Sequence, residues 1–211
     1  AQRGETFYGD AGDSIHKTSM NYAGDVIAIG GPHSDTNTGH VTIWTWDGFF
    51  WGQYGVLSGS SASEWFGENL SMNYAGNRIA VGAPQNLPFS AGYDEPGLVR
   101  VFEYNTGTYT WDQLGSDIVG LSGYDFFGFD VAMNQAGDRI IVGAPENDGA
   151  PNGYHNKTGQ SYVYEYSDGE WSQVGGALDV YTGYTNTQRK GFSVSIDSTG
   201  YRVAYGSPFT D

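Results

Sequence analysis

Short segments of the chain alternate apolar with polar or small residues at a period of two. Gly97-Leu-Val-Arg-Val-Phe102 and Gly159-Gln-Ser-Tyr-Val-Tyr164 are examples, and both are rich in β-branched and aromatic residues. Because successive side chains of a strand point to opposite faces of a sheet, this pattern predicts short β-strands. No long apolar run occurs, and glycines are frequent between the segments. The chain is therefore predicted to be all-β, with many short strands joined by turns.

The same lines of sequence return at a nearly constant spacing. The segment Ser19-Met-Asn-Tyr-Ala-Gly-Asp-Val-Ile-Ala-Ile-Gly-Gly-Pro32 has three counterparts, which end at Pro84, Pro145 and Pro208. A further line, Trp-x-Gln-x-Gly, recurs every 60 residues and begins at Trp51, Trp111 and Trp171. Self-similarity at one period indicates a repeat architecture, in which each unit buries its apolar faces against its neighbours.

Each repeat predicts four strands, designated A to D. In the third repeat they are Phe129–Met133, Arg139–Gly143, Ser161–Tyr166 and Glu170–Val174. Four strands in a unit of about 60 residues form one blade of a β-propeller. We therefore predict a β-propeller segment of four-stranded antiparallel blades. It is a single domain over residues 1–211, with repeats at approximately 14–60, 61–122, 123–185 and 186–211.

The four strand lines do not occur equally often. Lines A and B occur four times, but lines C and D occur three times, so the sequence holds three complete blades and the first half of a fourth. Propellers close with 4 to 8 blades, and an open arc leaves strand edges and sheet faces uncovered. We expect a larger propeller, completed by further blades from the same or another chain; the alternative is a ring or fibre of short chains.

Two of the repeats carry a recognisable pair of motifs around strands A and B. Phe66-Gly67 precedes Gly82-Ala83-Pro84, and Phe127-Gly128 precedes Gly143-Ala144-Pro145. These repeats resemble the FG-GAP repeats of integrin α-like propellers. The other two copies have drifted, to Gly30-Gly31-Pro32 and Gly206-Ser207-Pro208. The resemblance implies a propeller fold and an extracellular, adhesive or structural role, in which Gly82, Pro84, Gly143 and Pro145 are structural residues.

Integrin-like propellers bind calcium in some A–B loops, and the resemblance raises that question here. The A–B loops of this chain have five residues and offer at most two suitable side-chain oxygens each, whereas Ca²⁺ takes six to eight oxygen ligands. The family's usual calcium sites are therefore not carried over, and no cofactor is predicted. Weak calcium candidates remain in the third B–C loop, at Glu146, Asn147 and Asp148, where an Asp-Gly turn explains the same residues.

The repeated tryptophans have two interpretations. A small four-stranded sheet has two faces to cover, so large aromatic residues at Trp51, Trp111 and Trp171 are predicted to pack between blades. The alternative is an aromatic platform for a ligand. Ligand candidates in the variable B–C loops are Tyr93, Asp94 and Tyr154.

Charge narrows the range of partners. The formal net charge is −15, from 9 Lys and Arg against 24 Asp and Glu, which opposes binding to nucleic acid or to an anionic membrane surface. No segment reaches the length of a membrane span, so no membrane insertion is predicted. The absence of cysteine excludes disulfides and thiolate chemistry. Two N-glycosylation sequons have meaning only if the chain is secreted: Asn156, in a polar loop, can carry a glycan, whereas Asn69 lies in a predicted strand and is the poorer candidate.

The segments that match catalytic motifs do not fit the secondary structure that those motifs require. Ser14-Ile-His-Lys17 matches S-x-x-K, but that motif needs a helix, and this segment aligns with strand A. The four histidines, His16, His33, His40 and His155, show no zinc-binding spacing. We therefore predict a non-catalytic extracellular or cell-surface module that presents propeller loops to protein or glycan partners. One alternative is a lectin-like propeller, and another is a hydrolase with a site in the central channel.

Overall fold

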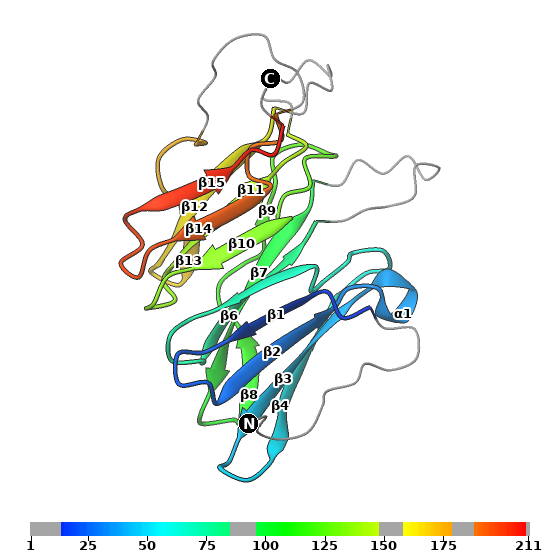
Figure 1. The fold of residues 1–211 in the computed structure, drawn as a ribbon, viewed down its shortest axis with the longest axis vertical. Coiled ribbons are helices and arrows are strands. Elements are labelled where there is room, and N and C mark those ends of the chain that lie inside the picture. Colours follow the sequence, from blue (N-terminus) through cyan, green and yellow to red (C-terminus); the bar gives the residue numbers. More distant parts are fainter. Residues whose placement is uncertain (1–13, 85–95, 148–157, 179–187, 210–211) are drawn as a thin grey trace.

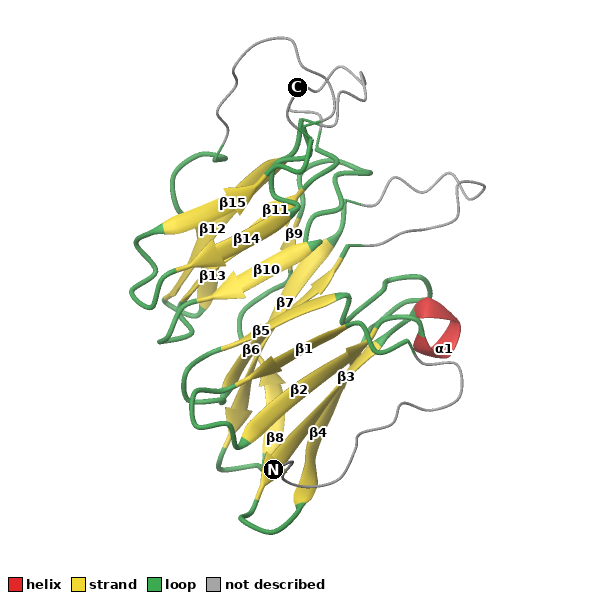
Figure 2. Ribbon diagram, viewed as in Figure 1, coloured by secondary structure: helices red, strands yellow, loops and turns green. Residues whose placement is uncertain are grey.

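The computed structural model describes residues 14–84, 96–147, 158–178 and 188–209. In these ranges the chain forms antiparallel sheets that follow one another along the sequence (Figure 1). One short turn, α1 (Ser34–Asn37), is the helical element among the described residues (Figure 2). The prediction of an all-β fold with four-stranded antiparallel blades is confirmed.

The strands fall into four sheets. The first holds β1 (Lys17–Met20), β2 (Val26–Gly31), β3 (His40–Trp46) and β4 (Trp51–Ser58). The second holds β5 (Asn69–Met72), β6 (Arg78–Ala83), β7 (Leu98–Asn105), β8 (Thr110–Gln113) and β9 (Ile118–Val119). The third holds β10 (Asp130–Met133), β11 (Arg139–Ala144), β12 (Gln160–Ser167) and β13 (Glu170–Gln173). The fourth has two described strands, β14 (Ser193–Ile196) and β15 (Val203–Gly206).

One sheet departs from the four-strand expectation. In the second sheet both β8 and β9 pair with β7, so the D position is split into two strands. The first sheet has one continuous strand there, β4, which crosses a register shift between Ile43 and Trp44. The segment from Gln113 to Ile118 is one residue longer than its counterpart from Gln53 to Leu57. A single added residue therefore breaks the ladder in the second sheet.

The hydrophobic core lies between the sheets. Val41 and Ile43 of the first sheet pack with Ile79 and Val81 of the second in one buried cluster. The third sheet contributes to two clusters, because adjacent residues of a strand point to opposite faces. Its Ile140 packs toward the second sheet, and its Ile141 packs with Val194 of the fourth. No sheet can bury its apolar residues alone, which is the physical basis of a propeller.

The first strands of successive sheets contact one another. Strand β5 lies between β1 and β10, and β10 lies between β5 and β14 (Figure 2). The A strands therefore meet along one side of the arc, while the C–D hairpins lie farther out (Figure 1). This arrangement places every A–B turn beside the A–B turn of the next sheet.

Candidate interaction site

The glycines of the Gly-Ala-Pro line lie against the next sheet. A β carbon on Gly82 would overlap the carbonyl oxygen of Gly128, and one on Gly143 would overlap that of Gly191. The same overlap occurs in the first, drifted repeat, between Gly30 and the carbonyl of Gly67. The motif thus marks a place where the backbones of two sheets touch, and only glycine permits that approach.

Two tryptophans of the repeated line, Trp111 and Trp171, pack between sheets. The indole nitrogen of Trp171 donates a hydrogen bond of 2.9 Å to the carbonyl oxygen of Leu114, in the second sheet. Trp111 lies against Gly55 of the first sheet, where an added β carbon would be 2.6 Å from its ring. Trp51 contacts Trp46 of its own sheet, with ring centres 5.4 Å apart. Trp111 and Trp171 are therefore covered by neighbouring strands and offer no open platform.

Each A–B turn is closed by its own side chain. The Oδ1 atom of Asn73 accepts hydrogen bonds from the amides of Gly76, Asn77 and Arg78, at 3.0 to 3.1 Å. Asn134 accepts the equivalent three bonds in the third sheet, and Asp197 serves the fourth. The centre of the turn is therefore lined by amide donors, which attract an acceptor and repel a cation.

The A–B turns form a ladder from sheet to sheet. The amide of Tyr22 donates to the carbonyl of Tyr74, Tyr74 donates to Gln135, and Gln135 donates to Ser198, each at 3.2 Å. The rings of Tyr22 and Tyr74 stack 4.3 Å apart and nearly parallel. They remain 76% and 44% exposed. The ladder thus carries a solvent-facing aromatic pair, which we name the Tyr22–Tyr74 pair.

The A strands share one polar position with a different residue in each sheet. It holds Lys17, Asn69, Asp130 and Ser193, each paired with the glycine of strand B. Asp130 accepts a 2.6 Å bond from Asn69 and another from the amide of Val194, and its carboxylate lies 3.7 Å from the ammonium of Lys17. One carboxylate therefore contacts all three other sheets. Both of its oxygens are engaged in these contacts.

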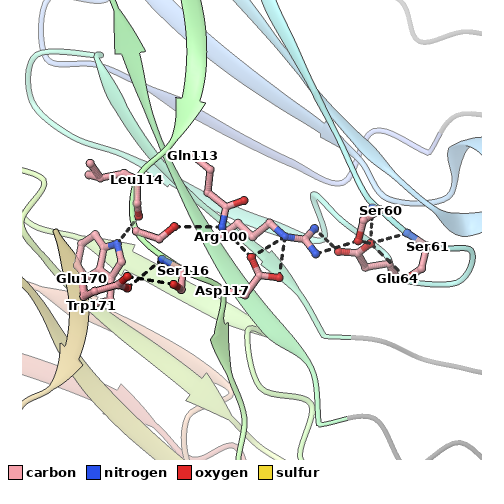
Figure 3. A network of polar contacts seen from close by, with 11 residues as sticks. Ser60, Ser61, Glu64, Arg100, Gln113, Leu114, Ser116, Asp117, Glu170 and Trp171 are labelled. Carbon is pink, nitrogen blue, oxygen red and sulfur yellow. Dashed lines mark hydrogen bonds and ion pairs between the residues drawn. The ribbon is translucent and has the colours of Figure 1, made fainter.

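A second polar network joins the first two blades at the D–A connection (Figure 3). Glu64 is fully buried and pairs with the guanidinium of Arg100 from β7, which also bonds Asp117 at 3.0 Å. Burial opposes the charge of Arg100, but Asp117 and Glu64 outweigh it and raise the pKa of Arg100. In the third sheet the same place holds Asp125, bonded to Asn147 at 2.6 Å. The blades share one scaffold but use different buried polar partners.

The sequence-predicted site residues are scattered rather than gathered. Glu146 pairs with Arg189 at 2.8 Å, and the side-chain amide of Asn147 donates to Asp125, so two of the three calcium candidates are engaged by protein groups. Asn69 is buried and bonded to Asp130. The remaining candidates lie outside the described residues: Tyr93, Asp94, Asp148, Tyr154 and Asn156. Within the described part of the chain, no three histidine or carboxylate side chains are grouped to hold a metal ion.

Sequence reasoning missed Asp130, Glu64 and Arg100. Their partners come from neighbouring sheets, and nothing in a single repeat indicates such pairing. The available signal was a departure from the repeat, since Asp130 and Arg100 occupy register positions where the other copies carry unlike residues.

Among the described residues, no helix is long and apolar enough to cross a membrane.

Stacked four-stranded antiparallel sheets with the core between them define a β-propeller segment. Comparison with protein families adds that residues 120–164 match the model of the FG-GAP repeat. The resemblance inferred from the two motifs is thus confirmed, and the match falls on the third repeat.

Comparison with solved structures shows a similar fold in Sqt1 of Saccharomyces cerevisiae. The two chains superpose with a TM-score of 0.53 at 16% sequence identity. The similarity covers 87% of this chain and 39% of the Sqt1 chain, so this chain spans well under half the length of that structure. At this identity the likeness concerns the fold alone. A sequence comparison with curated proteins gave no match.

Proposed function

We propose that the chain is a non-catalytic propeller module of an extracellular or cell-surface protein, which presents its connecting loops to protein or glycan partners. One observation carries the proposal: the residues that repeat lie between the sheets, whereas the B–C connections differ from copy to copy. Gly82, Gly143, Trp111 and Trp171 lie against the neighbouring sheet, and the turn asparagines close the A–B turns. A rigid scaffold with variable loops is the usual arrangement for recognition. The FG-GAP resemblance supports the same role by analogy.

The charges of the described residues support a protein or glycan partner over a polyanion. Arg78, Arg100, Arg139 and Arg189 are each paired with a carboxylate of this chain. These guanidinium groups are therefore already neutralised, and the chain carries a net charge of −15. Binding to nucleic acid or to an anionic bilayer would be opposed by this field.

Loop variants test the proposal. The chain is immobilised and probed with extracellular-matrix proteins and with a glycan array. We expect saturable binding that is lost in a triple variant with Tyr93→Ala, Asp94→Ala and Tyr154→Ala. The control is Tyr109→Ala, which removes a tyrosine that is 77% exposed on a C–D turn. Absence of binding to both panels, or equal loss in the control, argues against loop recognition.

We also propose that further blades, from the same or another chain, complete the ring. Strand β15 pairs with β14, and no other described strand pairs with it. The contacts between A–B turns and between glycines extend from the third sheet to the fourth, through Gln135 and Ser198 and through Gly143 and Gly191, which supports a repeating stack of sheets. Sequencing and intact mass of the protein from its source decide this point. A native 22.8 kDa chain that stays monomeric in sedimentation would contradict it.

A lectin-like role is a second candidate, and the Tyr22–Tyr74 pair favours it. Exposed tyrosine rings stack against the apolar face of a pyranose. In the same turn Asp25 is exposed, whereas Asn21 is buried and bonded within the turn. If the pair binds sugar, Tyr22→Ala removes glycan-array signal, while Tyr109→Ala retains it. Equal signal from both variants rules out this site.

A further inference from the structure

Two histidines of the first sheet lie beside a carboxylate of the second. His16 directly precedes β1, His33 follows β2, and Glu68 directly precedes β5. The Nδ1 atom of His16 is 3.0 Å from the carboxylate of Glu68. The His33 ring lies 6.1 Å from the His16 ring and 5.0 Å from the ring of Trp65, which it meets edge to face. This group, His16, His33 and Glu68, is named the first-junction cluster.

Glu68 is poorly compensated when the histidines are neutral. Its side chain is 11% exposed, and its Oε2 atom is buried with no hydrogen-bond partner among the described residues. Burial raises the pKa of Glu68, while His16 and His33 act to lower it. The nearby cations are engaged elsewhere: among the described residues Lys17 lies against Asp130, and Arg100 is paired with Glu64 and Asp117.

The equivalent positions elsewhere in the arc are apolar. In register, His16 and Glu68 correspond to Phe129 in the third sheet and Phe192 in the fourth. Phe129 and Phe192 contact each other, with ring centres 5.0 Å apart. An aromatic contact thus joins the last two sheets at the place where a titratable contact joins the first two. The two junctions therefore respond differently to protons.

We propose that the first-junction cluster is a pH-responsive contact, which strengthens the packing of the first sheet on the second as the medium becomes acidic. The buried carboxylate of Glu68 has one oxygen without a hydrogen-bond partner among the described residues, and an uncharged imidazole adds no ionic attraction to it. Histidine gains its charge between about pH 8 and pH 5. The imidazolium of His16 or His33 then attracts the carboxylate across the junction. Glu68 also has a raised pKa, so its own protonation at lower pH removes the remaining buried charge.

The direction of the effect follows from these charges. The contribution of this contact to the packing of the first sheet on the second is largest in mild acid. It is lost as pH rises through the range in which histidine loses its proton. This is opposite to the usual acid destabilisation of proteins rich in paired carboxylates. It goes beyond the proposed recognition role, because it concerns how firmly the first sheet is attached and makes no use of a ligand.

Hydrogen exchange of two matched amides tests the proposal. The Met72 amide donates to Ser19 across the first junction at 3.1 Å, and the Met133 amide donates to Ser71 across the second at 3.0 Å. Both methionines are buried to a similar degree. We expect the protection factor of Met72, relative to that of Met133, to be about fivefold higher near pH 5.5 than near pH 8, which is the size of one ion pair.

The variants separate this contact from general pH effects. In Glu68→Gln the ratio of the two protection factors is expected to be independent of pH. His16→Gln, at a half-exposed side chain that tolerates change, is expected to reduce the pH effect if Glu68→Gln does not fold. The proposal would be overturned if the protection factors of Met72 and Met133 changed equally with pH. A pH effect on their ratio that persists in Glu68→Gln would also overturn it.

Discussion

Gly82 of the second sheet lies so close to Gly128 of the third that a β carbon on Gly82 would overlap the Gly128 carbonyl oxygen. The two glycines belong to different motifs of different repeats, Gly-Ala-Pro in one and Phe-Gly in the next. The pair of motifs is therefore one contact seen from its two sides. The spacing between neighbouring sheets is set at this point by the absence of a side chain.

A substitution at Gly82 measures this contact. Gly82→Ala is expected to lower the free energy of unfolding by about 3 kcal/mol, because the sheets must separate to admit the methyl group. The matched control is Gly206→Ala, at the same position of the fourth repeat, where the nearest atom would be 3.6 Å away. Neither glycine has a positive φ, so backbone strain does not contribute. Urea unfolding of both variants is the measurement, and equal losses would refute the packing explanation.

The tryptophans allow a second matched comparison. Trp171 donates its indole N–H to Leu114, whereas the N–H of Trp111 is buried without a partner among the described residues. Trp171→Phe is therefore expected to cost about 1 kcal/mol more than Trp111→Phe, since only the first loses a hydrogen bond. Thermal or chemical unfolding reports the difference. Indistinguishable costs would mean that the Trp171 bond contributes no net stability.

The closure of the A–B turn by its own side chain is tested at Asn73. Asn73→Ala leaves three backbone amides without their acceptor, and we expect a loss of about 2 kcal/mol in unfolding free energy. Asn73→Asp keeps the acceptor, as Asp197 does in the fourth turn, and is expected to cost less than half as much. Unfolding curves in the presence and absence of Ca²⁺ should coincide for Asn73→Asp. If Ca²⁺ stabilises Asn73→Asp, the carboxylate binds the ion, which would contradict the explanation that the side chain only accepts bonds from the turn amides.

Alkaline pH should weaken the fold through a buried phenol. Burial raises the pKa of Tyr164 to about 12, against about 10 for an exposed tyrosine. The folded state therefore resists deprotonation, and its advantage is present below pH 10 and lost as pH rises from about 10 to about 12. Stability measured by urea unfolding across this range should fall, and Tyr164→Phe should remove part of the fall. Tyr54, whose pKa burial also raises, accounts for another part.

The local pattern of apolar residues and glycines is sufficient to predict the strands of the third repeat. The third repeat was predicted to hold strands at 129–133, 139–143, 161–166 and 170–174, and each observed strand agrees to within one residue at either end. The agreement has a physical cause, because alternation and turn glycines act between residues a few positions apart. The split of the D strand in the second sheet was not predicted, since it depends on one added residue opposite a continuous partner strand.

What the sequence determined by itself was the unit: four short strands, repeated, with faces that need a neighbour. Only the tertiary structure decided which side chains meet across those faces. Glu64 and Arg100, and likewise Asn69 and Asp130, come from segments 36 and 61 residues apart. Stacking of separate sheets brings them together, and no periodicity within a repeat encodes that choice. The strands and turns of the scaffold can therefore be predicted from the sequence. The polar partners that distinguish one blade from the next depend on how the sheets stack.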